Sequence, residues 1–318
     1  MKNNKVWAIS RPLISIIIPN YNRKDEFLRA FNSVCNIKPS IPFEVIIVDD
    51  GSSINLAYEY NYCLSFESFP VCLLEKENGG VHTARNKGVS IARGEYCIFL
   101  DSDDEILPNA FTLFLDELNK IPEGKKQSIF EVKFRCKNQN GEAISKELNS
   151  KINMMPKQKQ MHLISKCGEM IGIRKTVILK NNLFPEPNGI TFVMENILWD
   201  YLKATYDSWY SNSIIRIYHT ETDQKLTSVK RKNGQHCKNR CWNYCYLLNN
   251  SNIYQRETKN RVKCVFIYSM FKSLVKKTNT AENGISLKLT KRVDRLLEYL
   301  IKPLAIIASK IYYKKYFN

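Results

Sequence analysis

The sequence predicts an α/β fold in which helices flank a central, mostly parallel sheet. Over the first hundred residues, short apolar runs rich in β-branched side chains alternate with segments whose apolar residues recur at helical spacing. The runs are almost continuously apolar, as in strands covered on both faces, and polar turn residues follow several of them. Strands connected through helices pair in parallel with right-handed crossovers. The composition, 44% hydrophobic and 25% charged, excludes a disordered chain, a collagen-like repeat and a small disulfide scaffold.

Each expected element has its own signal in the sequence. The four strands are expected at residues 13–18, 43–48, 71–74 and 96–100. Between the first two, Phe27, Phe31 and Val34 lie on one helical face, and between the last two a helix over 81–91 stops before Gly94.

Positive charge is concentrated in the last third of the chain. The net charge is +17, yet residues 230–315 hold 20 Lys or Arg against four acids, a net of +16, and the first 229 residues carry 28 basic and 27 acidic groups. This step predicts a nearly neutral catalytic domain over residues 1–228 and a basic helical region over 229–318. Amphipathic helical runs are expected at 262–274 and 287–300, followed by a last segment of mixed Ile, Tyr and Lys. They favour contact with an anionic membrane surface, and a solvated helical subdomain is the alternative.

The cysteines and apolar runs bear on location. Ten cysteines without paired spacing indicate reduced thiols in a cytoplasmic protein. The first apolar run ends at Pro19, so a secretory signal is not expected. Lys302, Pro303 and Lys310 interrupt the apolar stretches near the end, so we expect no membrane-spanning helix.

Polar residues follow three of the expected strands, at 19–22, 49–53 and 101–104. In a parallel sheet, ligands bind beyond the carboxyl ends of the strands. Clustered carboxylates repel one another unless a cation lies between them, and a hard divalent ion with oxygen ligands suits such a cluster. A helix cap or a turn is the alternative role for each acidic group.

Six short motifs occur in a fixed order: PNYN at 19–22, VDDGS at 48–52, NGG at 78–80, ARNKG at 84–88, GEY at 94–96 and LDSDD at 100–104. With them, residues 12–110 resemble family 2 glycosyltransferases. The resemblance implies the nucleotide-sugar-binding GT-A fold, transfer with inversion at the anomeric carbon, and a divalent metal, Mn²⁺ or Mg²⁺.

The resemblance also implies nucleotide-binding residues. Pro19 and Tyr21 would line the base pocket, and Asp50 would accept a hydrogen bond from a uracil-like ring nitrogen. Arg85 would lie near the base or the diphosphate, and Asp101 would face the ribose. The donor-binding set that follows from this is Pro19, Tyr21, Asp50, Arg85, Asp101 and Ser102.

Asp103 would ligate the metal that bridges the diphosphate. His219 lies where relatives carry a segment that closes over the diphosphate, so it would complete the metal shell or contact phosphate, unless it is an ordinary surface histidine. Asp104 has a second interpretation as the cap of the following helix.

The catalytic base is expected at Glu195. The resemblance implies a Glu-Asp pair in this segment, but Asn196 occupies the second position, and an amide cannot take a proton from an acceptor hydroxyl. Glu186 and Asp200 are the competing carboxylates, and an impaired enzyme is a further alternative.

The resemblance implies an enzyme that moves a sugar from a nucleotide diphosphate donor of the UDP class to a hydroxyl of a growing surface glycan of capsule or O-antigen type. A lipid-linked acceptor and a peripheral position at the inner face of the cytoplasmic membrane follow from the family context. The alternative class is a protein that binds nucleic acid or an anionic surface through the basic region. Nucleic acid is the less favoured partner because that region carries no recognised nucleic-acid motif.

Overall fold

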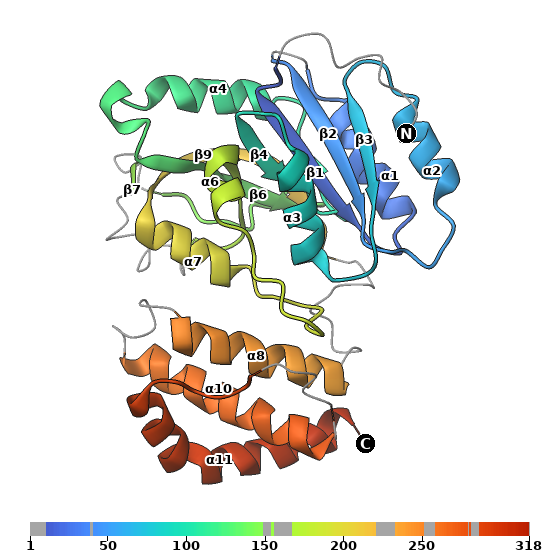
Figure 1. Ribbon diagram of the computed structural model, residues 1–318. Coiled ribbons are helices and arrows are strands. Elements are labelled where there is room, and N and C mark those ends of the chain that lie inside the picture. The colour runs from blue at the N-terminus through green and yellow to red at the C-terminus, as the bar shows by residue number, and fades with distance from the viewer. Residues whose placement is uncertain are drawn as a thin grey trace. The chain divides into compact units, whose positions relative to one another are not determined.

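The computed structural model describes residues 11–38, 41–148, 154–155, 167–220, 233–250, 258–278, 280 and 286–317. The chain divides into two compact units (Figure 1). The first consists of Met1–Leu183 with Leu202–Thr222, and the second of Phe184–Tyr201 with Asp223–Asn318.

The N-terminal half of the first unit is a parallel α/β sheet. Its elements are β1 (Ile14–Asn20), α1 (Asp25–Cys35), β2 (Phe43–Asp49), α2 (Ala57–Leu64), β3 (Val71–Glu75), α3 (Val81–Ile91) and β4 (Tyr96–Phe99). The strands lie in the order β3-β2-β1-β4, and all their pairings are parallel. The four expected strands and both expected helices are confirmed, and α2 is an additional helix.

The second half of this unit adds mainly antiparallel pairings. Its elements are β5 (Glu105–Ile106), α4 (Ala110–Lys120), the 3₁₀ turn η1 (Glu123–Lys125), β6 (Ile129–Asn138), β7 (Met154–Met155), β8 (Met170–Lys175), α6 (Thr176–Asn181) and β9 (Asp207–Tyr218). Helix α7 (Asn196–Thr205) precedes β9 and begins in the second unit. β8 pairs antiparallel with β4 and β6, β9 pairs parallel with β6, and β5 and β7 pair antiparallel with β9. Within the described residues these strands form one mixed sheet, which is parallel only in part.

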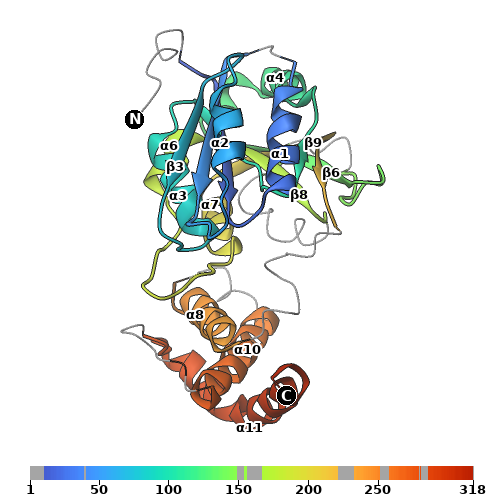
Figure 2. The same cartoon turned by 90° about the vertical axis from the view of Figure 1, so that its right-hand side faces the viewer.

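Helices cover both faces of the parallel half. On one face, Ile16 and Ile18 of β1 join a core that includes Phe27 of α1 and Phe114 of α4. Helices α1 and α2 lie side by side here (Figure 2), with the Phe31 and Tyr62 rings 6.2 Å apart. On the other face α3 contacts β1 and β2. Gly88 permits this approach, because a Cβ there would lie 2.5 Å from Ile17 Cγ2.

The second unit contains three long helices, α8 (Gly234–Asn250), α10 (Thr258–Lys277) and α11 (Arg292–Tyr316). Helix α10 packs against both α8 and α11. The run expected at 287–300 and the separate last segment form one helix, α11, which begins at Arg292 and continues through Pro303. Contacts with α10 before and after the proline explain this continuity: Asp294 pairs with Arg261, and the Tyr312 ring lies 5.5 Å from that of Phe271.

All ten cysteines are free thiols, as the sequence indicated. Cys237, Cys241 and Cys245 are buried on α8. Among the described residues, no helix combines the length and apolar character that crossing a membrane requires.

Candidate active site

The carboxyl ends of β1, β2 and β4 meet at one edge of the sheet, because β1 lies between the other two strands. Asn20 pairs with Asp49 at the ends of β1 and β2. Backbone hydrogen bonds continue past the strands: Asp50 N donates to Asn20 O at 2.8 Å, and Leu100 N donates to Ile17 O at 3.0 Å. The three polar segments that follow these strands are therefore neighbours.

The Asp50 carboxylate holds the loop that precedes α3. Its Oδ1 accepts hydrogen bonds from Lys76 Nζ at 2.7 Å and Gly79 N at 3.0 Å, and its Oδ2 accepts one from Gly80 N at 2.7 Å. Helix α3 begins directly after Gly80, so the carboxylate also lies at the positive end of the helix dipole. Gly51 completes the turn with φ of +72°, and a Cβ there would lie 2.6 Å from a loop backbone nitrogen. Asp50 thus positions the loop, a role that the sequence did not reveal.

The acidic segment after β4 is matched by arginines. Asp101 Oδ1 lies 2.7 Å from Arg85 Nη2, which belongs to α3. Asp103 Oδ1 lies 2.9 Å from Arg23 Nη1, in the segment between β1 and α1, and the same nitrogen donates to Ser102 Oγ at 3.2 Å. The Asp101 side chain is 32% exposed and that of Asp103 16%. The carboxylates therefore have cationic partners supplied by the chain itself.

Asp104 is the buried member of this segment. His219 N donates to its Oδ1 at 3.2 Å, and Arg216 Nη1 lies 3.3 Å from its Oδ2. Burial raises the pKa of Asp104 to about 8, with the charges of Asp101 and Asp103 adding to the rise and Arg216 opposing it. The three carboxylates are therefore close enough to repel one another. The helix-cap interpretation of Asp104 is wrong, because a different residue occupies the N-cap of α4.

His219 lies beside the acidic segment because β9 pairs with β5. The register places Glu105 opposite Ile217, and His219 Nε2 lies 2.7 Å from Glu105 Oε1. Arg29 Nη2 donates to the backbone oxygen of Asp103 at 2.9 Å. Within the part of the chain that the structure describes, no three His, Cys, Asp or Glu side chains form a group that could hold a metal ion by themselves.

Three further side chains border this edge. Pro19 lies buried near the end of β1, and Tyr21, two residues later, is 41% exposed. His82, on the first turn of α3, is buried, and neither ring nitrogen has a hydrogen-bond partner among the described residues. Burial lowers the pKa of His82 to about 4, against the effect of the Asp50 charge.

Glu195 belongs to the second unit, directly before α7. Its Oε2 accepts a hydrogen bond from Trp199 Nε1 at 3.0 Å, one helical turn later. Asn196 Nδ2 lies 3.4 Å from Asp200 Oδ2. Glu186 is exposed. The assignment of Glu195 as the catalytic base stays a prediction.

Sequence reasoning missed the cations Lys76, Arg23 and Arg216. Two of them had a positional signal: Arg23 directly follows the PNYN motif, and Lys76 directly follows β3 at the same edge of the sheet. Arg216 had none, because its approach to Asp104 depends on the pairing of β5 with β9.

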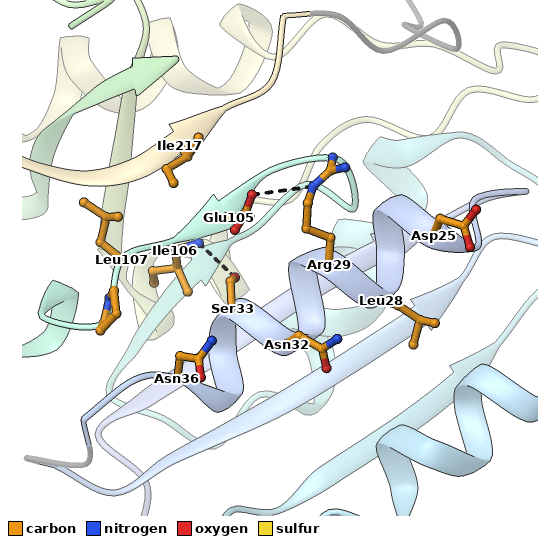
Figure 3. Close-up of a pocket in the computed structure, with 11 residues that line it drawn as sticks. Asp25, Leu28, Arg29, Asn32, Ser33, Asn36, Glu105, Ile106, Leu107 and Ile217 are labelled. Atoms are coloured by element: carbon orange, nitrogen blue, oxygen red, sulfur yellow. Dashed lines mark hydrogen bonds and ion pairs between the residues drawn. The ribbon is translucent and has the colours of Figure 1, made fainter. Parts of the chain in front are cut away.

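A groove of about 530 Å³ lies beside this edge, between α1 and the segment around β5. In Figure 3, Arg29 and Glu105 point toward each other across it, and their Nε and Oε1 atoms are 3.6 Å apart. Leu28, Ile106 and Ile217 also line it. Glu105, which lines this groove, also contacts His219, and no sequence pattern predicted the groove.

Known proteins with similar sequences are glycosyltransferases. The model of the family described as Glycosyl transferase family 2 matches residues 15–180. The uncharacterized glycosyltransferase YibD of Escherichia coli (strain K12) is 37% identical over 99 residues, which are 31% of this chain and 28% of that protein. Chondroitin synthase of Pasteurella multocida (strain Pm70) is 39% identical over 109 residues, 34% of this chain and 11% of that protein. The matched segment thus spans less than a third of each of these two relatives.

Solved structures show the same fold at low identity. S. aureus TarS 1–349 in complex with UDP has a TM-score of 0.53 and 14% identity, over 95% of this chain and 91% of that chain. The mannosyltransferase PcManGT from Pyrobaculum calidifontis, in complex with GDP-Man and Mn²⁺, has a TM-score of 0.52 and 13% identity, over 97% and 90%. The family match covers more than half of the 318 residues, and the chain therefore belongs to glycosyl transferase family 2 as a glycosyltransferase with the GT-A fold.

Proposed function

We propose that this glycosyltransferase transfers a sugar from a UDP-sugar donor, with inversion at the anomeric carbon, to a hydroxyl of a growing surface glycan. The observation that carries the proposal is the pairing of carboxylates with cations where β1, β2 and β4 end. Asp50 lies against Lys76, and Asp101 lies against Arg85. This edge offers acceptors for the ring and ribose of a nucleotide together with positive charge for its diphosphate.

The cations have a direct physical use. Arginine presents a planar fork of donors that suits phosphate oxygens. Arg23 and Arg85 reach the acidic segment from two different elements, so a diphosphate bound there would meet positive charge from both. Preorganised charge of this kind stabilises a leaving group that departs as an anion. Tyr21, with its exposed ring, is the proposed stacking partner of the base.

The oxygen donors at this edge suit Mn²⁺ or Mg²⁺, because both ions prefer carboxylate oxygen to nitrogen or sulfur. Asp103 is the proposed metal ligand, and Asp101 lies beside it. His219 is proposed either to bind the metal through its ring or to contact a phosphate of the donor. A bound divalent ion would neutralise charge on the departing diphosphate. The mutual repulsion felt by Asp104 supports this assignment, because a cation between the carboxylates would relieve it.

Glu195 is the proposed base. Its carboxylate would accept the proton of the acceptor hydroxyl as the oxygen attacks the anomeric carbon. The hydrogen bond from Trp199 would orient the carboxylate. The acceptor is proposed to be a lipid-carried glycan, and the enzyme to work peripherally at the inner face of the cytoplasmic membrane.

Ligand-dependent thermal stability tests the donor assignment. We would measure the melting temperature with UDP, GDP or CDP, each with and without Mn²⁺ or Mg²⁺. A ligand at a hundred times its Kd stabilises a protein by about 2.7 kcal/mol, so the effect is measurable. We expect metal-dependent stabilisation by UDP above that by the other nucleotides. Asp101→Asn should abolish the UDP effect, and Asp116→Asn, an exposed carboxylate on α4, should leave it unchanged.

Turnover is then measured with a panel of UDP-sugars and a synthetic lipid-linked acceptor. Inversion is read from the anomeric configuration of the product by NMR. Equal stabilisation by all three nucleotides would remove the UDP assignment. Binding of UDP without any transfer would favour the alternative that Asn196 raises, namely a catalytically impaired transferase.

A further inference from the structure

Helix α11 carries a stripe of exposed apolar side chains. Each of its seven members exposes between 55% and 77% of its surface. Apart from the adjacent Tyr299 and Leu300, they recur at intervals of three or four residues, so they lie along one side of the helix. The members of this α11 stripe are Val293, Leu296, Tyr299, Leu300, Leu304, Ile307 and Ile311. In the described part of the chain, ten large apolar side chains are at least 55% exposed, and seven of them lie here.

The charges of α11 are sorted between two sides. Both of its acids pair with α10: Asp294 with Arg261 at 2.6 Å, and Glu298 with Lys272 at 2.8 Å. The remaining charged side chains of the helix are all cations, and all are exposed. They are Arg292, Arg295, Lys302, Lys310, Lys314 and Lys315. The surface of α11 away from α10 is therefore apolar and positively charged, without a free acid.

Charge complementarity decides which partner fits this surface. A second copy of the chain would bring a second set of cations against the first, which opposes self-association through the stripe. An anionic bilayer offers acyl chains to the stripe and phosphate groups to the cations. A helix with this distribution of charge lies in the plane of the membrane interface rather than across it. Lys302, halfway along α11, agrees with that orientation.

We propose that α11 docks onto an anionic phospholipid bilayer, with the α11 stripe inserted among the acyl chains and the flanking Lys and Arg side chains at the headgroup phosphates. The inference rests on the membrane location proposed above and names the surface responsible for it. It does not depend on the sugar, the metal or the base.

Vesicle co-sedimentation of the full-length protein tests this docking. The vesicles contain phosphatidylcholine alone, or phosphatidylcholine with roughly a third phosphatidylglycerol, at low and high salt. The test variant combines Leu296→Ser, Leu304→Ser and Ile307→Ser. The matched control combines Tyr58→Ser with Val177→Ser, two exposed apolar side chains of the first unit. Because all five positions are exposed, both variants should fold, which circular dichroism and melting curves check.

We expect the wild-type protein and the control to bind the anionic vesicles, with weaker binding at high salt. The triple variant should bind at least ten times more weakly, and hydrolysis of a UDP-sugar in solution should be the same in all three proteins. Unchanged vesicle binding by the triple variant would overturn the proposal. A wild-type dimer that the triple variant converts to a monomer, without any difference in vesicle binding, would also overturn it and assign the stripe to self-association. Absence of UDP-sugar hydrolysis in all three proteins would instead count against the proposed function.

Discussion

Asp103→Asn separates a structural role of the acidic segment from a chemical one. Asp103 Oδ1 lies 2.9 Å from Arg23 Nη1, and the two side chains are 16% and 13% exposed. Exposed ion pairs contribute about 0.2–1 kcal/mol, and breaking a fully buried pair costs about 3–5 kcal/mol. Breaking this pair of intermediate burial should lower the free energy of unfolding by about 1–2 kcal/mol, because Asn can still accept a hydrogen bond. Since proteins of this kind are stable by about 5–15 kcal/mol, the variant should remain folded at 25 °C.

A structural role therefore predicts nearly unchanged turnover. A role as metal ligand predicts a far larger effect, because charge stabilisation by a divalent ion is worth several kcal/mol and each 1.36 kcal/mol is tenfold in rate. We expect the melting temperature to fall by about 2–8 °C. Transfer should fall about a hundredfold or more, and Mn²⁺-dependent stabilisation by UDP should disappear.

Glu298→Gln is the matched control for Asp103→Asn. It breaks the pair with Lys272, which spans 2.8 Å and leaves Glu298 18% exposed, so its structural cost should be similar. This pair lies in the second unit, on the side of α11 that faces α10. The control should lose comparable thermal stability and keep wild-type hydrolysis of the UDP-sugar in solution. If Asp103→Asn keeps turnover within a few-fold of wild type with the same metal requirement, Asp103 is not the metal ligand.

Three further changes have expected outcomes. Glu195→Gln should lower transfer to the acceptor while UDP affinity, read by calorimetry, stays constant, and near-normal turnover would remove Glu195 from the base role. The pKa of His82 in the folded protein, about 4, lies below its usual value near 6.5. Between these two pH values the unfolded chain binds a proton that the folded chain does not, so the free energy of unfolding falls by up to about 3 kcal/mol as the pH is lowered. His82→Asn should remove that part of the slope of urea-unfolding free energy against pH over this window, and equal slopes for both proteins would contradict the assignment. Gly88→Ala should cost about 1–3 kcal/mol in urea unfolding, because the added methyl overlaps Ile17; a neutral result would mean that α3 and β1 can move apart freely.

The parallel half of the sheet was predictable because its information is local. Strands 43–48 and 96–100 are runs of β-branched and apolar residues, and their ends carry turn residues, so neither depends on distant partners for recognition. The meeting of the polar segments then followed from the rule that parallel strands share one carboxyl edge. Helix α2 was not predicted, because its polar and aromatic residues do not show a clear helical spacing of apolar side chains.

The antiparallel half and the cationic partners could not be derived in the same way. The pairing of β5 with β9 joins residues more than a hundred positions apart, and it helps to bring His219 and Arg216 to the acidic segment. The sequence pointed to a cation between the carboxylates, and the structure adds arginines beside them. For a related reason, the sequence predicted two separate segments where the structure has the single helix α11. Pro303 is a helix breaker by local rules, but packing on α10 at both ends of the helix outweighs the one hydrogen bond that the proline removes.

The arrangement of charge also explains why the two ends of the chain differ so strongly. At the strand ends, Asp101 and Asp103 each have an arginine, so this edge is close to neutral before any ligand binds. A diphosphate together with a divalent ion would add charges of opposite sign that largely cancel, so the first unit needs no large excess of either sign to accept its proposed donor. The +16 carried by residues 230–315 is therefore not needed to balance the charge of the proposed donor. An excess of that size opposes folding through self-repulsion unless it meets an anionic partner, and the exposed cations beside the α11 stripe are where such a partner would be met.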